Sequence, residues 1–140
     1  MPPFHLAFPV SCLTKTRHFY GTVLQCSEGR AAERWVDFDF FGHQISAHLQ
    51  DPISEQVSTN EVDGDAVPIR HFGVILDIPT WRELTERIAN FQIEFLIPPK
   101  LRFKGQPGEQ GTCFVTDPSG NVLEFKCFAS PDLIFQTETS

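Results

Sequence analysis

Apolar and polar side chains alternate along residues 4–10, close to the N-terminus. Four apolar residues occupy every second position and share one face, while His5 and Ala7 share the other. This period of two predicts a strand with one buried face. A helix is predicted to follow from Ser11 to Leu24, with Ser11 as its N-cap and an apolar stripe behind it.

A hairpin is predicted next. Residues 34–40 alternate cleanly, Phe41-Gly42 indicates a tight turn, and residues 43–49 form the second arm. Residues 50–68 then lose the pattern. They are polar and rich in Pro, Gly, Asn and Asp, which is typical of a linker. Because long irregular loops are uncommon in compact domains, this one could also cover a site.

The pattern begins again after this linker. Residues 70–76 alternate as a strand, with His71 and Gly73 on the face opposite the apolar residues. Thr80-x-x-Glu83 resembles a capping box, and apolar residues at helical spacing follow it, which predicts a helix over residues 80–91. The remaining strands are predicted at three places: 93–97 with an extension toward 103, 112–116, and 121–128. Asp117-Pro118-Ser119-Gly120 predicts a turn before the last of them.

The order strand, helix, strands therefore occurs twice. His5 and His71 both stand at the start of a strand that precedes a helix, and they are 71 − 5 = 66 residues apart. Halves of that length make a tandem duplication an economical explanation. The element order predicts an α+β fold.

Composition narrows the class of protein. A chain of 140 residues with 41% hydrophobic residues, 14 of them Phe, is long enough for one domain with a core. A net charge of −7 argues against nucleic acid as the main partner, which needs a basic face. No apolar run approaches the length of a membrane span and no signal peptide is evident, so we expect a cytoplasmic protein. The four cysteines are widely spaced, which excludes a zinc finger and predicts reduced thiols.

Candidate chemistry lies on the polar faces of the predicted strands. His5 and His71 occupy the same place in the two halves, and Glu124 alternates with apolar Leu123 and Phe125. Two imidazoles and one carboxylate form a ligand set for Fe(II) that also suits Mn, Ni or Zn. The alternative is two structural histidines and a surface carboxylate.

The segment Asp117 to Phe125, together with His5 and His71, resembles the vicinal oxygen chelate superfamily. That superfamily includes glyoxalase I, extradiol dioxygenases, fosfomycin-resistance enzymes and bleomycin-binding proteins. The resemblance covers about residues 3–128. It implies two tandem βαβββ modules whose mixed sheet cups around a metal site held by His5, His71 and Glu124, with the helices outside. Module one would span about residues 3–49 and module two about 69–128, within a single domain of residues 1–140 that ends in a tail at 129–140.

The resemblance also implies candidates around that site. In glyoxalase I a fourth ligand, usually Glu, falls on the strand 43–49, but Gln44, Ser46 and His48 share the relevant face here. His48 is therefore a candidate fourth ligand, or a residue that supports a ligand or faces the substrate. The extradiol dioxygenases leave this position unliganded, but the acid–base His and the Tyr that they use have no counterpart here; Phe114 lies near the place of the Tyr. Arg102 and Lys104 are candidates for binding an anionic substrate, or are solvated charges.

These features predict a metal-dependent enzyme acting on a small, oxygen-rich molecule, dioxygenase-like by its ligand set. The alternatives are a glyoxalase-type lyase or isomerase, and a ligand-sequestering binding protein of the antibiotic-resistance kind. A vestigial site in a structural domain is a further alternative. We expect a homodimer, with the site built either within one chain or across the dimer.

Overall fold

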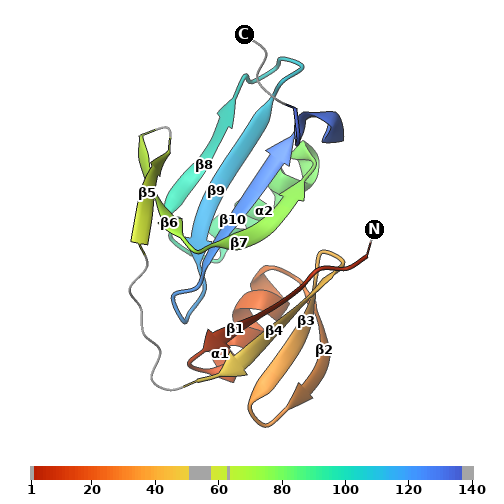
Figure 1. The fold of residues 1–140 in the computed structure, drawn as a ribbon, viewed down its shortest axis with the longest axis vertical. Coiled ribbons are helices and arrows are strands. Elements are labelled where there is room, and N and C mark those ends of the chain that lie inside the picture. The colour runs from red at the N-terminus through yellow and green to blue at the C-terminus, as the bar shows by residue number, and fades with distance from the viewer. Residues whose placement is uncertain (1, 51–57, 63, 137–140) are drawn as a thin grey trace. The chain divides into compact units, whose positions relative to one another are not determined.

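The computed structural model describes residues 2–50, 58–62 and 64–136. They form two compact units (Figure 1). Among the described residues, the first unit comprises those up to residue 71 together with the turn at 116–122, and the second comprises residues 72–115 and 123–136. Each unit contains a four-stranded sheet with a helical segment on one face.

The first unit has the order β-α-β-β-β. Its elements are β1 (His5–Val10), α1 (Leu13–Arg17), a π-helical turn (His18–Val23), β2 (Ser27–Ala32), β3 (Trp35–Phe40) and β4 (His43–Leu49). The strand order is β1-β4-β3-β2, in which β1 pairs with β4 in parallel and the other pairs are antiparallel. A two-residue turn joins β3 to β4, with Phe41 and Gly42 both at positive φ, as such hairpins require.

The second unit repeats this order. Its elements are β7 (Phe72–Leu76), α2 (Ile78–Asn90), β8 (Ile97–Arg102), β9 (Gln110–Thr116) and β10 (Val122–Phe128), followed by a short 3-10 helix (Pro131–Leu133). The strand order is β7-β10-β9-β8, with β7 parallel to β10. The predicted α+β fold with two βαβββ modules is thereby confirmed.

Each sheet buries one face against its helical segment. In the first unit the ring of Tyr20 lies 5.5 Å from that of Phe8 and 5.4 Å from that of Phe38, centroid to centroid. In the second unit the indole N–H of Trp81 donates a 2.9 Å hydrogen bond to the carbonyl oxygen of Phe125. The helices therefore cover the apolar faces of the strands, as predicted, and polar residues are left on the opposite face.

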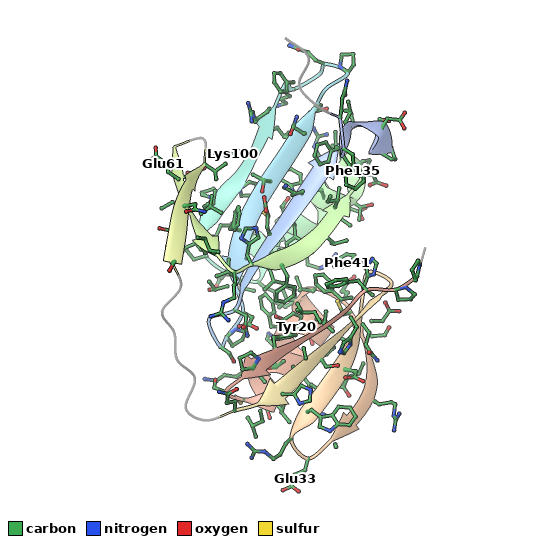
Figure 2. All side chains as sticks on the ribbon, in the orientation of Figure 1. Tyr20, Glu33, Phe41, Glu61, Lys100 and Phe135 are labelled. Atoms are coloured by element: carbon green, nitrogen blue, oxygen red, sulfur yellow. The ribbon has the colours of Figure 1, made fainter. Side chains whose placement is uncertain are left out.

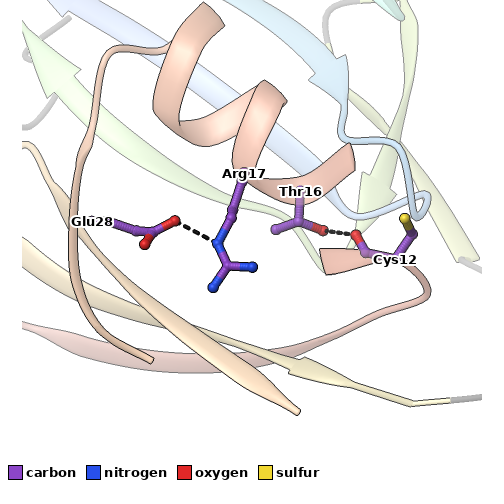
Figure 3. A network of polar contacts seen from close by, with 4 residues as sticks. All are labelled: Cys12, Thr16, Arg17 and Glu28. Carbon is purple, nitrogen blue, oxygen red and sulfur yellow. Dashed lines mark hydrogen bonds and ion pairs between the residues drawn. The ribbon is translucent and has the colours of Figure 1, made fainter. Parts of the chain in front are cut away.

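The first helix differs from its prediction at the N-terminus. Its N-cap is Cys12, with no capping side chain, and the backbone N–H of Ser11 instead donates to Ser119 Oγ. The Thr16 hydroxyl donates to the carbonyl oxygen of Cys12, and Arg17 Nε lies 2.6 Å from Glu28 Oε1 on β2 (Figure 3). Ser11 thus serves a long-range contact that local sequence rules cannot detect.

The second helix also begins earlier than predicted. Asp77 is its N-cap, and its carboxylate accepts the backbone N–H of Thr80 at 2.8 Å. The prediction of a capping box that begins at Thr80 was therefore wrong. The N-cap Asp77 lies three residues upstream, and Pro79 fits the first turn of the helix.

Three stretches of strand departed from expectation because they lack a clear apolar alternation. β2 is exposed along its whole length and lies at a sheet edge. Part of the predicted linker forms a hairpin of β5 (Ser58–Val62) and β6 (Asp65–Ile69), while residues 51–57 and 63 lie outside the described part. β8 begins at Ile97 rather than residue 93 and contains two prolines, which an edge strand tolerates.

Candidate functional site

The polar face of the first sheet brings together residues from three adjacent strands. His5 on β1 lies opposite Gln44 on β4, and Ser46 on β4 lies opposite Asp37 on β3. Residues paired across neighbouring strands share a face, so these side chains project from the face that the helix does not cover. The sequence analysis identified His5 but missed Asp37. Its alternation with buried Val36 and Phe38 was a usable signal.

Hydrogen bonds connect these four residues in a row. His5 Nδ1 lies 2.8 Å from Gln44 Oε1, and Gln44 Nε2 donates to Asp37 Oδ2 at 3.4 Å. The Ser46 hydroxyl donates to the other oxygen, Asp37 Oδ1, at 2.5 Å. Because a carboxylate only accepts, the amide nitrogen of Gln44 must face Asp37 and its oxygen must face His5. His5 therefore donates from Nδ1, which leaves the ring lone pair on Nε2.

His71 has the same tautomer for a different reason. It directly precedes β7, and its Nδ1 lies 2.7 Å from the carbonyl oxygen of Pro68, which can only accept. The lone pair again falls on Nε2. His43 shows the opposite arrangement: its Nδ1 accepts the backbone N–H of Phe4 at 2.8 Å, which puts its proton on Nε2. His43 therefore fixes the start of β1, whereas His5 and His71 both carry the proton on Nδ1 and the lone pair on Nε2.

Glu124 occupies the polar face of the second sheet. It lies opposite Gly73 of β7, and the hydroxyl of Thr112 on β9 donates to Glu124 Oε2 at 2.6 Å. A Cβ atom at position 73 would overlap the backbone carbonyl of Glu124. Glycine is therefore required at position 73 for β7 and β10 to pair at this point, and Thr112 orients the carboxylate.

His48 shares the polar face of the first sheet with Gln44 and Ser46. It pairs with Trp35 of β3, and their ring centroids are 6.4 Å apart. His48 lies four residues beyond Gln44, which along a strand corresponds to about 13 Å. That separation from the residue opposite His5 favours a substrate-facing role over ligation, and both roles stay predictions.

The predicted cations lie at the end of β8. Arg102 pairs with Gln110 and its guanidinium lies 5.4 Å from the ring centroid of Phe103; Lys104 follows the strand, and both cations are exposed. Lys100, labelled in Figure 2, lies on β8. It is nearer to Glu124 in register because it pairs with Thr112. The sequence analysis did not single out Lys100, although its position on β8 would have suggested it once the register was known.

The predicted triad is distributed over the chain, with His5 in the first unit and Glu124 in the second. Among the described residues, no group of three or more His, Cys, Asp or Glu side chains forms a ready metal site. The chemistry of the donors still fits a divalent ion, because both imidazoles carry the lone pair on Nε2 and the third group is a carboxylate. The triad stays a prediction.

The turn between β9 and β10 carries a second polar cluster, which belongs to the first unit. The buried carboxylate of Asp117 accepts the Tyr20 hydroxyl at 2.8 Å, the Asn121 side-chain amide, and two backbone N–H groups. Asn121 also donates to the carbonyl oxygen of Pro9. Burial raises the pKa of Asp117, and the hydrogen bonds that it accepts oppose this rise. These bonds make the segment Asp117 to Asn121 a structural element.

Two of the four cysteines, Cys113 and Cys127, do not supply thiolates at neutral pH. None of the four cysteines forms a disulfide; Cys12 is half-buried and the other three are buried. Burial raises the pKa of Cys113 to about 12 and that of Cys127 to about 11, so both thiols stay protonated at neutral pH. Among the described residues, no helix has the length and apolar composition to cross a membrane.

Comparison with solved structures identifies the family. The chain is 32% identical to a glyoxalase/bleomycin resistance protein/dioxygenase from Alicyclobacillus acidocaldarius, with a TM-score of 0.76 and 96% of each chain covered. The chain belongs to the glyoxalase/bleomycin resistance protein/dioxygenase family. This agrees with the resemblance to the vicinal oxygen chelate superfamily that the motifs indicated.

Two further solved structures share the fold at lower sequence identity. The fosfomycin resistance protein FosX from Listeria monocytogenes is 20% identical, with a TM-score of 0.70 over 96% of this chain and 98% of that one. A putative glyoxalase family protein from Bacillus anthracis is 16% identical, with a TM-score of 0.64 over 91% and 95%. The sequence matches no family model and no curated protein.

Proposed function

We propose that this chain is a cytoplasmic, metal-dependent enzyme of the vicinal oxygen chelate type that acts on a small, oxygen-rich substrate. His5, His71 and Glu124 would hold one divalent ion: Fe(II), Mn, Ni or Zn. The observation that carries the proposal is the matching tautomer of the two histidines. Each donates from Nδ1 to a fixed acceptor and so presents Nε2 to a metal, which is how ligating histidines are normally oriented.

The strand register supports grouping His71 with Glu124. Glu124 lies opposite Gly73, and His71 is two residues before Gly73. Side chains two residues apart on a strand share a face, so extending the alternation of β7 by one residue puts His71 on the face of Glu124. The first sheet would then supply one ligand and the second sheet two.

Three protein ligands leave coordination positions for substrate and water, as catalytic metal sites do. When bound, such an ion supplies a Lewis acid that stabilises negative charge on a chelated substrate oxygen. The chain's own contribution is to orient the donors through Gln44, the carbonyl oxygen of Pro68, and Thr112. His48 and Trp35 lie on the same open face and are available to contact substrate.

The register also bears on the alternative activities. In the first sheet His5 is two residues before Ala7, which lies opposite Ser46, so Ser46 corresponds to Glu124. A serine there supplies no carboxylate, which favours the three-ligand, dioxygenase-like set over the four-ligand pattern of glyoxalase I. A glyoxalase-type lyase or isomerase would then need His48 as its additional ligand. A sequestering protein would bind its ligand without this metal set.

Metal binding can be measured directly. Purified protein is stripped with a chelator and titrated with Fe(II) without oxygen, and with Mn(II), Ni(II) and Zn(II), by calorimetry. We expect one ion per chain, lost in His5→Ala, His71→Ala and Glu124→Ala but kept in His43→Ala, the matched histidine of opposite tautomer. Metal binding unchanged in the first three variants would refute the proposed site.

The expected homodimer can be tested together with the location of the site. His5→Ala and Glu124→Ala chains, each with its own affinity tag, are co-expressed and the mixed dimer is isolated. If one site combines His5 of one chain with Glu124 of the other, the mixed dimer recovers one intact site per two chains. If each chain builds its own site, the mixed dimer binds no metal. A monomer by light scattering would refute the dimer.

The substrate class is tested with a screen of catechols and α-ketoaldehydes on the metal-loaded protein. Ring cleavage with uptake of O₂ would support the dioxygenase-like activity, and isomerisation would support the lyase or isomerase. The proposed anion-binding role of Arg102 and Lys104 predicts weaker binding of carboxylated substrates in their alanine variants, and Lys100→Ala provides the comparison from the same strand. Equal effects on neutral analogues would refute that role.

A further inference from the structure

The polar face of the first sheet contains a carboxylate that the proposed ligand set does not use. Asp37 is half-buried on β3, and it accepts hydrogen bonds from Gln44 and Ser46. Both donors come from β4, so the carboxylate is held from one side by two side chains. Gln44 in turn contacts His5 on β1. The row of contacts thus crosses three strands and ends on an imidazole.

The direction of these bonds is fixed by chemistry. A glutamine amide can turn either its oxygen or its nitrogen toward His5, and the two choices give opposite histidine tautomers. Asp37 decides between them, because its carboxylate attracts the amide nitrogen and would repel the amide oxygen. Only with the nitrogen toward Asp37 does the oxygen of Gln44 accept from His5 Nδ1.

We propose that Asp37 is a positioning residue that acts through Gln44 to hold His5 in the tautomer with its lone pair on Nε2. The inference rests on the proposed metal site for its functional meaning, but the tautomer itself is a property of the metal-free protein. Asp37 also polarises the amide, which strengthens the bond that Gln44 accepts and makes His5 a better donor to a cation. In this relay from Asp37 through Gln44 to His5, the 3.4 Å contact between Gln44 and Asp37 is the weakest hydrogen bond.

The relay gives a role to Gln44 and Ser46, which the three proposed metal ligands alone do not explain. A glutamine opposite a ligand could turn either way, and an exposed histidine without a fixed acceptor would populate both tautomers. Ser46 donates to Asp37 Oδ1, and Gln44 donates to Asp37 Oδ2. Ser46 therefore occupies one carboxylate oxygen and leaves the other for Gln44.

The direct test is nitrogen-15 NMR of the histidine rings in metal-free protein at pH 8.5, where imidazoles are neutral. His5 is assigned from its loss in His5→Gln. We expect wild-type His5 to be protonated predominantly on Nδ1, a mixture of both tautomers in Asp37→Ala, and a smaller change in Asp37→Asn, whose oxygen can still accept from Gln44. His43, protonated on Nε2, should be unchanged in every variant and serves as the internal reference.

Calorimetric titration then measures the consequence for metal binding. Asp37→Ala should weaken metal affinity about tenfold, the lower end of the effect of groups that orient ligands. Gln44→Leu should do the same, and Asp37→Ala should add nothing further in a Gln44→Leu background, because the effect passes through the amide. Asp39→Asn removes the same charge from the same strand. It should leave the His5 tautomer unchanged and the metal affinity within twofold of wild type.

Two results would overturn the inference. One is a wild-type His5 protonated on Nε2. The other is an Asp37→Ala protein whose His5 tautomer is unchanged, or is changed equally by Asp39→Asn. Failure of the proposed function looks different: wild-type protein would bind no metal, while the Asp37-dependent tautomer in the metal-free protein would still be present.

Discussion

The two sheets share one architecture but arrange polar side chains differently at corresponding positions. In the first sheet, Ala7 lies opposite Ser46, and the nearest carboxylate is Asp37, one strand away. In the second sheet, Gly73 on β7 lies opposite Glu124 on β10, so the carboxylate is on the strand that pairs with β7. His71 directly precedes β7. Modules with one backbone architecture can therefore carry different polar side chains. In the proposed site, the first sheet would orient His5 through Gln44 and Asp37, and the second would supply the carboxylate of Glu124 directly.

The turns between the last two strands differ as well. Phe41 and Gly42 make a short turn in which Asp39 accepts one backbone N–H. The corresponding turn of the second module centres on Asp117, which is buried and accepts four hydrogen bonds. The first turn only reverses the chain, while the second is tied to Tyr20 and, through Asn121, to Pro9.

The largest expected effect on stability comes from substituting the residues that lie opposite Glu124 and Ser46, which are Gly73 and Ala7. Gly73→Ala should destabilise the protein by about 3 kcal/mol or more, since its Cβ would overlap the backbone of Glu124 and cannot be relieved by a rotamer change. Ala7→Gly should cost only about 0.5–1 kcal/mol from added chain entropy. Urea unfolding of both variants measures the difference, and equal losses would show that the two positions are not packed differently.

The losses of stability on removing the two turn carboxylates, Asp117 and Asp39, should differ almost as much. Asp117→Ala leaves the buried Tyr20 hydroxyl and several N–H groups without their acceptor, at a cost of about 3 kcal/mol. Asp39→Ala removes one exposed acceptor and should cost about 0.5 kcal/mol. Thermal unfolding at neutral pH compares the two variants. Similar losses in both would mean that the cluster around Asp117 adds nothing to an ordinary turn.

The same cluster predicts a dependence on alkaline pH. Burial, and then the charge of Asp117, raise the pKa of Tyr20 well above its ordinary value of 10.0. The folded pKa lies above the unfolded one, so this stabilisation is complete below pH 10 and is lost as pH rises through the folded pKa. Tyr20→Phe should remove this part of the alkaline loss. A parallel alkaline profile in the variant would contradict it.

Substitutions at Glu124 and at Ser46 should differ in how much they weaken metal binding. Glu124→Gln should weaken metal binding more than 100-fold, about 2.7 kcal/mol, because it removes a ligand, and groups that merely orient ligands already account for 10- to 100-fold. Ser46→Ala should weaken binding a few-fold through Asp37. Calorimetry on the stripped proteins provides both values. If Ser46→Ala were the more damaging variant, the assignment of the ligand to the second sheet would be reversed.

The smallest effect concerns the helix N-termini. Asp77 caps α2, and its hydrogen bond to Thr80 lowers its pKa, whereas Cys12 of α1 has no capping bond. The stabilisation from Asp77 is present above the ordinary Asp pKa and is lost as pH falls through its lowered folded pKa. Asp77→Ala should therefore be slightly destabilising at pH 7 and neutral at pH 2–3. Cys12→Asp should be slightly stabilising at pH 7. Both are measured by unfolding at the two pH values.

The sequence by itself determined the repeated order of elements and most of the strands. Alternation is local, so residues 4–10 and 34–49 were placed within a residue or two, and His5 and Glu124 were assigned to polar faces. The edge strand β2 escaped this reasoning, and the start of the edge strand β8 was placed four residues too early, because both bury little and have no clear apolar period.

Only the tertiary structure decided which polar groups meet. Strand register placed Gly73 against Glu124 and Asp37 against Ser46, and register depends on pairings between residues far apart in the sequence. The tautomer of His5 depends on Gln44, which is 39 residues away. Hydrogen bonds at that range leave no local periodicity, because each partner needs only to be polar and to lie on the correct face. The sequence could therefore name the candidate histidines, and only the folded sheet could show how each ring is oriented.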